Sequence, residues 1–451
     1  MRSSPWSSLM RGLSALAVTA ALGAPGRVAA EDVLTIEDAV RLALQNNAAL
    51  GRAARQVERA EQQVLVSRTR RLPNLEVEAM AGTTLNALRV SFPTGAFGSF
   101  PSTGPIPATD TVVEAPRSLS GSVTATVAQP ITQLHRIGLS TKMSELTRDL
   151  EQEKLREQRA ALVAEVRRAY YGLLQLQSVL AAKEEQIQAF RELDRIVGQQ
   201  VVTEVALRAD GLEVKARLAA EEYDMAAVRG DLQTSREKLN WLLGRDLSHA
   251  FEVAAVPEAA LEEVVLDAAV ARALARRPDL AQARLAVVQA ETDRRLKKAE
   301  RIPDVSLALT YYSFVNVDLL PKNLAQVGVQ VRWEPFDWGR KSKETAEKTI
   351  QLDQARTAAR EAQDRARLEV AQSFRRLQQA RLLIQAERLG REAARERLRV
   401  QTVRHGQSVA LMKDVLEAQA GMSAAHARYD QALAAFWTAK ADFQKAMGEE
   451  L

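Results

Sequence analysis

An internal repeat limits the folds open to this chain more than any other feature of its sequence. Residues 34–73 align without a gap on residues 264–303, and eleven of the 40 positions are identical. Roughly three matches would be expected by chance in a chain so rich in alanine. The alignment resumes at an offset of 204, where the matched pairs are Val205/Val409, Ala206/Ala410, Leu207/Leu411 and Asp210/Asp414. The sequence therefore predicts two copies of one structural plan.

The change of offset from 230 to 204 makes the first copy 26 residues longer than the second. Most of this excess is the segment 91–117, which holds five prolines and three glycines in 27 residues. Such a composition predicts a long exposed loop between two strands. We divide the chain into a leader (1–30), a first repeat (31–245), a linker (246–263) and a second repeat (264–451).

Residues 1–30 have the features of a secretory signal peptide. The leader begins with a basic part that contains Arg2 and Arg11, and an apolar stretch follows from Leu13 to Leu22. The leader ends in the small residues Ala29-Ala30. This order predicts export and cleavage before Glu31. A membrane helix is the alternative, but a stretch of about a dozen apolar residues is shorter than the roughly 20 needed to span a bilayer.

Composition excludes several classes of function. The chain carries a formal charge of +5, but the leader contributes three arginines and no acid, which leaves 59 basic against 57 acidic residues. A net charge of +2 does not favour nucleic-acid binding. The absence of cysteine excludes disulfides and thiolate sites, and four histidines and eight methionines are too scattered for a metal site. No nucleophile–base set or phosphate-binding loop is present, so neither an enzyme nor a cofactor is predicted.

Each copy predicts a helix, two strands, a long helix and a returning helix. The apolar residues between Leu162 and Val201 mostly recur at alternating steps of four and three, which is typical of a coiled-coil seam. A helix from 139 to 201 would be on the order of 90 Å long. The predicted first helices end before Pro73 and Pro303, since a helix usually stops before proline. The predicted ranges are 35–71, 139–201 and 206–244 in the first copy, and 265–300, 340–404 and 409–447 in the second.

Four segments contain runs in which apolar and polar residues alternate with a period of two, and they predict strands at 74–90, 118–131, 303–315 and 325–335. This alternation is typical of outer-membrane barrel strands, with lipid on one face and water on the other. Aromatic residues gather at the strand ends, where an interfacial girdle would lie: Tyr311, Tyr312, Trp333, Phe336 and Trp338. A small periplasmic sheet packed on the helices would show the same alternation. In a membrane, four strands cannot close a barrel, so closure would require two, three or four copies.

Several motifs carry a family resemblance along the whole mature chain. They are Leu34-Thr35-Ile36-Glu37-Asp38-Ala39-Val40, Arg277-Pro278-Asp279-Leu280, Leu72-Pro73-Asn74-Leu75, Gln129-Pro130, Glu334-Pro335-Phe336-Asp337-Trp338-Gly339-Arg340 and Asp414-Val415-Leu416-Glu417-Ala418-Gln419. In this order they resemble the TolC family of outer-membrane efflux and secretion ducts. The resemblance implies an α+β membrane protein. It would be a homotrimer whose 12-stranded outer-membrane barrel, four strands per protomer, continues into a periplasmic α-helical tunnel.

The same resemblance implies the partners and the sites. A periplasmic adaptor protein and an inner-membrane pump would meet the tunnel at the two helical turns, through Val205, Ala206, Leu207, Gly406, Val409, Ala410 and Leu411. These apolar residues could instead pack between their own helices. Matched to the family's acidic constriction, Asp414 and Glu417 would form the periplasmic gate, with Asp210 and Glu213 as the equivalent pair. Alternatively, these carboxylates are ordinary solvated groups on a helix face.

Two departures from the family pattern are present. Residues 131–138 replace the aromatic, acidic and Gly-Arg residues that usually follow Gln-Pro, and Glu204 stands where the family often has glycine. The expected function is passive export of small molecules, such as drugs and toxic compounds, through a duct driven by a partner pump. Protein secretion with an ABC-type exporter is the alternative within the same fold. A periplasmic coiled-coil scaffold without a barrel is the alternative from another class.

Overall fold

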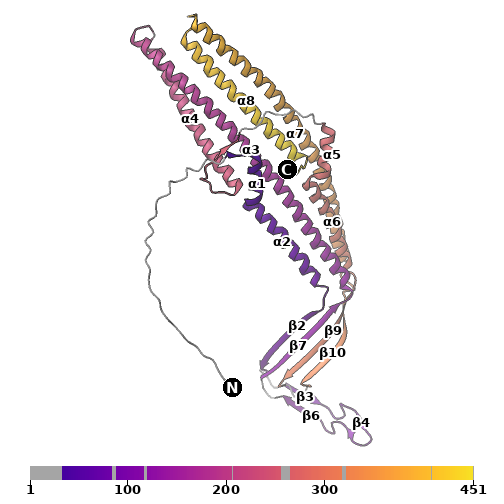
Figure 1. The fold of residues 1–451 in the computed structure, drawn as a ribbon. Coiled ribbons are helices and arrows are strands. Elements are labelled where there is room, and N and C mark those ends of the chain that lie inside the picture. Colours follow the sequence, from indigo (N-terminus) through magenta and orange to yellow (C-terminus); the bar gives the residue numbers. More distant parts are fainter. Residues whose placement is uncertain are drawn as a thin grey trace, which may run out of the picture.

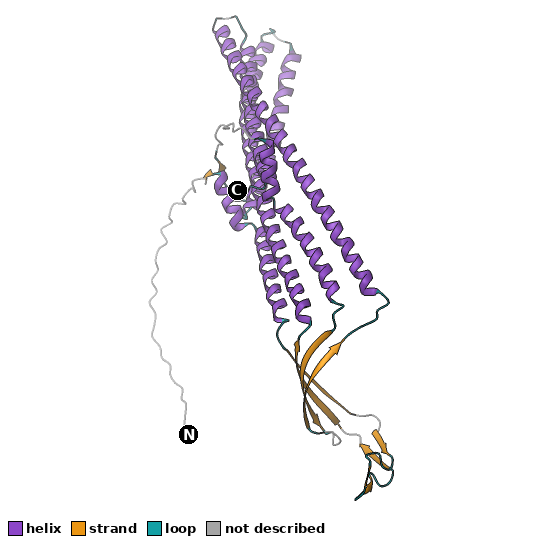
Figure 2. Ribbon diagram, turned by 90° about the vertical axis from the view of Figure 1, so that its right-hand side faces the viewer, coloured by secondary structure: helices purple, strands orange, loops and turns teal. Residues whose placement is uncertain are grey.

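The computed structural model describes residues 33–83, 88–115, 119–205, 207–254, 265–316, 321–407 and 409–449. The predicted leader and the second half of the predicted linker lie outside these residues. The molecule is elongated, with helices over most of its length and a sheet at one end (Figure 1). Figure 2 shows the strands leaving the helical part as a curved, twisted ribbon.

Two long helical hairpins make up most of the molecule. The first pairs α3 (Gln133–Val202) with α4 (Arg208–Leu243), and the second pairs α7 (Arg340–Gly406) with α8 (Met412–Ala446). At 1.5 Å per residue the 70 residues of α3 extend over roughly 105 Å. Helix α3 also packs along α8, so the four helices lie in the order α4, α3, α8, α7. Among the described residues, none of the helices has the length and apolar character needed to cross a membrane.

The single first helix predicted in each repeat is wrong, because each is broken in two. Helices α1 (Ile36–Asn46) and α2 (Ala48–Thr69) meet at Asn47, and α5 (Leu266–Arg276) and α6 (Pro278–Ala299) meet at Arg277. Asn47 has ψ of 120°, and its side-chain oxygen accepts hydrogen bonds from the next helix at Ala49 and Leu50. Arg277 precedes a proline, which disfavours the helical conformation for the residue before it.

The main sheet has four antiparallel strands in the order β10-β9-β7-β2. They are β2 (Asn74–Thr83), β7 (Leu119–Pro130), β9 (Asp304–Val315) and β10 (Asn323–Arg332). The two repeats meet where β7 pairs with β9, and the outer strands β2 and β10 each have one unpaired edge. Each repeat thus contributes one hairpin of strands, and the sheet joins the two repeats.

The strand predicted over 74–90 is wrong in its second half. Strand β2 ends at Thr83, and β3 (Leu88–Phe92) pairs with β6 (Thr111–Ala115) in a separate two-stranded sheet. A smaller hairpin follows, formed by β4 (Ser99–Phe100) and β5 (Gly104–Pro105). These strands lie beyond the end of the main sheet that is farther from the helices (Figure 1). The described part of the predicted Pro/Gly loop therefore forms two hairpins.

The larger apolar core lies around the middle of the helices, where α1, α3 and α4 pack together with a short pair of strands, and we call this region the central belt. Strands β1 (Val33–Leu34) and β8 (Glu252–Val253) pair in parallel, so the start of the predicted linker contains a strand. The hydroxyl of Tyr170 on α3 donates to the carbonyls of Leu34 and Ala254, each at 2.9 Å. Leu173, Leu239 and Leu243 are buried in the same core. This packing anchors the ends of the first repeat to α3.

Candidate functional site

The two helical turns at the far end of the hairpins have the same backbone design. In the first turn the amide of Val205 donates to the carbonyl of Gln200 at 2.8 Å, and in the second Val409 donates to Arg404 at 2.9 Å. Glu204 has a left-handed backbone with φ of 59°. Gly406, in contrast, is the last residue of α7 and does not have a positive φ. In the first turn, the position whose left-handed backbone favours glycine is therefore occupied by Glu204.

Apolar side chains are exposed at both turns. Val205 and Leu207 are 75% and 71% exposed, and Val409 and Leu411 are 73% and 71% exposed. These four side chains therefore do not pack between the two helices of their own hairpin, at least within one chain. Ala410 is half-buried, and its carbonyl lies 3.0 Å from Nδ1 of His405. Ala206 lies outside the described residues.

The two aspartates of the predicted gate begin the returning helices. An oxygen of the Asp210 carboxylate accepts a hydrogen bond from the Leu207 amide at 3.1 Å, and Asp414 accepts one from Leu411 at 3.0 Å. Each satisfies an amide that precedes the first turn of its helix, and a carboxylate there also interacts favourably with the helix dipole. Both residues consequently have a structural role besides any role in a gate.

The structure brings three of the four predicted gate carboxylates to one cavity. Asp210 and Glu213 of α4 and Glu417 of α8 line a cavity of about 290 Å³, and Asp414 does not. Its apolar lining comes largely from α3 and includes Phe190, Leu193 and Val197. Glu213 forms an ion pair with Arg217 at 2.5 Å, while Lys413 lies 3.9 Å from Glu417. Both basic residues also line the cavity, so acidic and basic groups of two hairpins share one space near the turns.

The aromatic residues predicted as one girdle divide between the two faces of the sheet. Tyr311 shares a face with the exposed Leu307, Leu309 and Val327. Tyr312 lies on the opposite face, where its ring stacks on Phe314 with centroids 6.0 Å apart. Successive residues of a strand point to opposite faces. Tyr311 and Tyr312 therefore do not share one face of the sheet, and of the two only Tyr311 lies on the apolar face.

The junction between β10 and α7 contains Trp333, Phe336 and Trp338, all of them exposed. Phe336 and Trp338 pack edge to face with ring centroids 4.9 Å apart. Trp338 and Gly339 both have a left-handed backbone, with φ of 55° and 80°. The Asp337 carboxylate accepts hydrogen bonds from the amides of Gly339 and Lys341, and these bonds lower its pKa although some desolvation opposes them. Asp337 thereby starts α7 directly after the strand.

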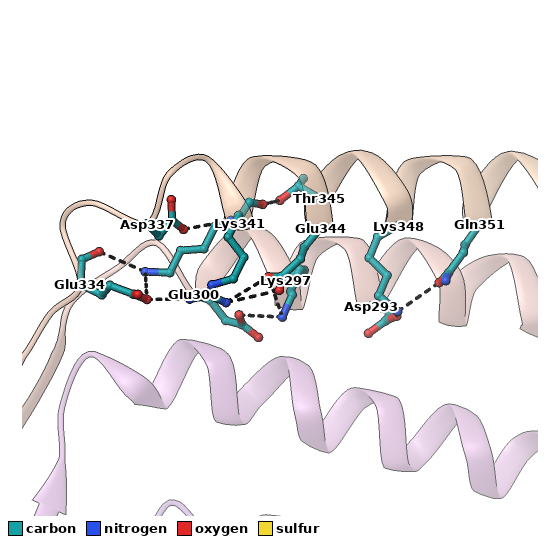
Figure 3. Close-up of polar contacts among 11 residues, drawn as sticks. Asp293, Lys297, Glu300, Glu334, Asp337, Lys341, Glu344, Thr345, Lys348 and Gln351 are labelled. Carbon is teal, nitrogen blue, oxygen red and sulfur yellow. Dashed lines mark hydrogen bonds and ion pairs between the residues drawn. The ribbon is translucent and has the colours of Figure 1, made fainter.

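An ion-pair network ties this junction to α6, and composition alone did not predict it (Figure 3). Lys297 of α6 lies 2.9 Å from Glu300 and 3.2 Å from Glu344 of α7. Arg340 joins Glu334 at 2.7 Å, and Lys348 joins Asp293 at 2.8 Å. The hydrogen bond from Lys297 is the largest cause of the lowered pKa of Glu344. The network fixes how the second strand pair continues into the second hairpin.

The corresponding junction of the first repeat is built differently, in line with its different sequence. The Thr132 hydroxyl donates to the Pro303 carbonyl at 2.6 Å and accepts from the Val305 amide at 2.8 Å. Arg136 forms an ion pair with Asp304 at 2.9 Å. These contacts attach the start of α3 to the start of strand β9, which belongs to the second repeat. In the described part of the chain, no cluster of histidines or acidic residues has the arrangement of a metal site.

Comparison with known proteins identifies both repeats. The model of the family described as outer membrane efflux protein matches residues 39–245 and 269–449. The Campylobacter jejuni CmeC outer membrane channel superposes with a TM-score of 0.76 at 14% identity, over 92% of this chain and 85% of that one. CusC gives 0.74 at 17% identity over 92% of each chain. The outer membrane protein VceC of Vibrio cholerae gives 0.71 at 16% identity, over 92% and 96%. No curated protein sequence matches this chain.

Proposed function

This chain is a member of the outer membrane efflux protein family, and from that premise we propose that it is the outer-membrane duct of a tripartite export system. Three copies would form a 12-stranded barrel in the outer membrane and a helical tunnel in the periplasm. Small molecules would enter from a periplasmic adaptor and an inner-membrane pump and leave passively to the exterior. The CmeC and CusC structures, described as an outer membrane channel and a transmembrane channel, support this proposal by their shared fold.

The exposed apolar face of the sheet is the observation that carries the proposal. Leu75, Val77, Val327, Val329 and Val331 lie on this face and are all more than half exposed. Tyr311 pairs with Ala325, which lies eight residues before Trp333 on the same face. At about 3.3 Å per residue the two aromatics are separated by roughly 26 Å, close to the apolar band of about 25 Å in outer-membrane barrels. Lipid would cover such a face.

The unpaired edges of β2 and β10 support closure of a barrel by several copies. An open edge in lipid leaves backbone groups without hydrogen bonds, and each such group costs several kcal/mol. Pairing β10 of one copy with β2 of the next would satisfy both edges. The number three is the number that the family resemblance implies.

The outer face of α7 supports the same assembly. Leu368, Leu382, Leu389 and Val403 are exposed and lie at multiples of seven residues, as in a coiled-coil seam without its partner. Subtracting 204 maps Leu382 and Leu389 onto Ser178 and Glu185, which hydrogen-bond to Asp430 and Ser423 of α8.

Those α8 partners correspond in turn to Ala226 and Ala219 of α4, both exposed. By this equivalence two leucines of one copy would lie against two alanines of the next copy, and α7 would pack on the neighbouring α4. A large residue opposite a small one fills such a seam without a void. The contact between α3 and α8 within one chain is the template for this contact between chains.

The exposed turns support docking of an adaptor. The two helical turns lie at the end of the molecule opposite the sheet (Figure 1). Their exposed apolar side chains are Val205, Leu207, Val409 and Leu411, and a partner would bury them. In the closed assembly, Asp414 and Glu417 of three copies would approach one axis. Their mutual repulsion would require bound cations or basic partners, which makes such a constriction able to open.

The test is insertion of the purified mature protein into a planar bilayer, together with its mass in detergent. We expect discrete conductance steps and the mass of a trimer. A monomer that stays soluble without detergent and gives no conductance would favour the periplasmic scaffold instead. Deletion of the gene then separates the two transport readings. Greater sensitivity to small toxic compounds supports the proposal, whereas loss of a secreted protein without such sensitivity supports protein secretion.

A further inference from the structure

A cavity of about 170 Å³ lies between α3 and α8, at the seam of the two repeats. Tyr171, Leu174 and Ser178 line it from α3, and Asp430, Leu433 and Trp437 line it from α8. It is separate from the turns, from the carboxylate cavity near them and from the sheet junctions. A cavity of about 150 Å³ is large enough to hold one benzene ring. The volume therefore suits a compact molecule with a single ring.

Two aromatic side chains give the cavity its character. The rings of Tyr171 and Trp437 are stacked with centroids 6.2 Å apart and an interplanar angle of 27°. Tyr171 is only 5% exposed, and burial is the main cause of its raised pKa. Its hydroxyl forms no hydrogen bond with any described residue, unlike the hydroxyl of the neighbouring Tyr170. In the same pair of rings, Nε1 of Trp437 is a buried donor that bonds to no described residue, and such a group is uncommon and calls for an explanation.

A carboxylate supplies the charge. Asp430 accepts a hydrogen bond from the Ser178 hydroxyl at 2.5 Å, which uses one of its oxygens. Nε2 of His426 is 3.8 Å away, beyond hydrogen-bond distance. Nζ of Lys440 lies 4.9 Å from the centre of the Trp437 ring, and the positive charge of Arg167 acts on Tyr171. Asp430 therefore keeps capacity for a further donor.

We propose that this cavity is a binding site for a compact aromatic amine, whose ring lies against Tyr171 and Trp437 and whose ammonium group pairs with Asp430. A carboxylate beside aromatic rings is a combination that recognises organic cations. Nε1 of Trp437, which bonds to no described residue, can donate to an oxygen substituent on the ring. The proposal goes beyond passage through a duct, because binding at this seam does not require an open pore.

The test uses tyramine and 4-hydroxyphenylacetate as probes, which share a phenol ring and have opposite charges. Calorimetry on the purified mature protein in detergent should show saturable binding of tyramine, at one site per chain, and much weaker binding of the acid. The variant Asp430→Asn keeps an acceptor for Ser178 and removes the charge. It should weaken tyramine binding about tenfold, as expected for the loss of a hydrogen bond between charged groups.

Asp442→Asn is the matched control, because Asp442 is a carboxylate on the same helix that faces Arg168 at 3.6 Å and does not line the cavity. Tyramine binding should be unchanged in this variant, and Tyr171→Phe should weaken it less than Asp430→Asn does. Three results would overturn the proposal: no saturable tyramine binding, equal binding of the two probes, or equal effects of the Asp430 and Asp442 variants. Conductance of the same preparations reports the duct function independently.

Discussion

A Cβ atom on Gly244 would lie 2.5 Å from the carbonyl oxygen of Asn46. Gly244 ends the returning helix α4 with φ of 68°, and Gly448 follows α8 with φ of 70°. A Cβ on Gly448 would lie 2.9 Å from the amide nitrogen of Arg277. Each glycine thus meets the break between the two short helices of its own repeat. The break is held from the other side too, because Asn47 donates to the Leu242 carbonyl at 3.0 Å and Arg277 to the Ala446 carbonyl at 3.2 Å.

We expect Gly244→Ala to lower the free energy of unfolding by at least about 2 kcal/mol. A left-handed alanine costs about 1–2 kcal/mol, and the contact with Asn46 adds to this cost. The measurement is the shift of the thermal midpoint of the mature protein. Gly230→Ala is the control, because Gly230 lies inside α4 with no atom within 4 Å of its Cβ position. It should leave stability unchanged or raise it by up to about 1 kcal/mol.

Replacing Glu204 by glycine should stabilise the first turn by about 1 kcal/mol, since glycine adopts a φ of 59° without the strain of a side chain. Hydrogen exchange at the Val205 amide, which bonds to Gln200 in this turn, measures the effect. Glu204→Ala removes the same charge and keeps the strain. If the alanine variant gains as much protection as the glycine variant, the charge of Glu204 and not its backbone is responsible.

The pKa of Tyr170 is raised from 10 to about 12, mainly by burial, and this makes the central belt sensitive to alkali. The folded protein holds the phenolic proton more tightly than the unfolded chain does. The stabilisation is therefore complete below pH 10 and is lost as the pH rises to about 12. The difference corresponds to about 3 kcal/mol. Unfolding midpoints measured across this range should fall more steeply for the wild type than for Tyr170→Phe.

At neutral pH, Tyr170→Phe should cost about 1–3 kcal/mol, because the buried hydroxyl that bonds to the carbonyls of Leu34 and Ala254 is lost. Tyr171→Phe is the control, because the Tyr171 hydroxyl bonds to no described residue, and we expect a much smaller loss. A wild-type midpoint that stays constant from pH 10 to 12 would contradict the role given to Tyr170.

The two hairpins contain one ion pair with its charges exchanged. Lys183 of α3 lies 2.9 Å from Asp224 of α4, and the equivalent Glu387 of α7 lies 3.5 Å from Arg428 of α8. Lys183→Glu should destabilise the first hairpin by about 1 kcal/mol. The new carboxylate would face those of Asp224 and Glu221, so that three acids would repel one another. Adding Asp224→Arg reproduces the arrangement of the second hairpin and should restore part of the loss.

A double-mutant cycle on the thermal midpoint measures this coupling. Arg191→Glu is the comparison, because its pair with Glu222 is more exposed and we expect a smaller effect. Additive effects of the two substitutions at 183 and 224 would show that the pair contributes nothing to the hairpin.

The predicted gate can be separated from the helix cap by the choice of substitution. Asp414→Asn combined with Glu417→Gln removes both charges and keeps a side-chain oxygen for the Leu411 amide. If repulsion among carboxylates sets the resting pore, this pair should raise single-channel conductance as much as the corresponding alanine pair. If only the alanine pair raises the conductance, the cause is the loss of the helix cap at Asp414. The variant Asp442→Asn, distant from the turns in the chain, should leave conductance unchanged.

Much of the architecture was predictable because it depends on local periodicity and on the repeat. The steps of three and four residues in the long helices, and the steps of two in the strands, arise from the geometry of each element. The breaks at Asn47 and Arg277 were missed, because an interruption of one residue leaves the apolar period almost intact. The only sign in the sequence of the left-handed backbone at Glu204 was that the family often has glycine at this position.

The amino-acid sequence by itself determined the duplication, the order of elements, the family and the residues at the turns, since all of these are properties read along the chain. Only the tertiary structure decided which residues meet. It separated Tyr311 from Tyr312, gave Asp210 and Asp414 a capping role, and placed Asp430 beside Tyr171 although 259 positions separate them in the chain. The physical reason is that packing between helices joins side chains by distance in space, which no periodicity along one helix encodes.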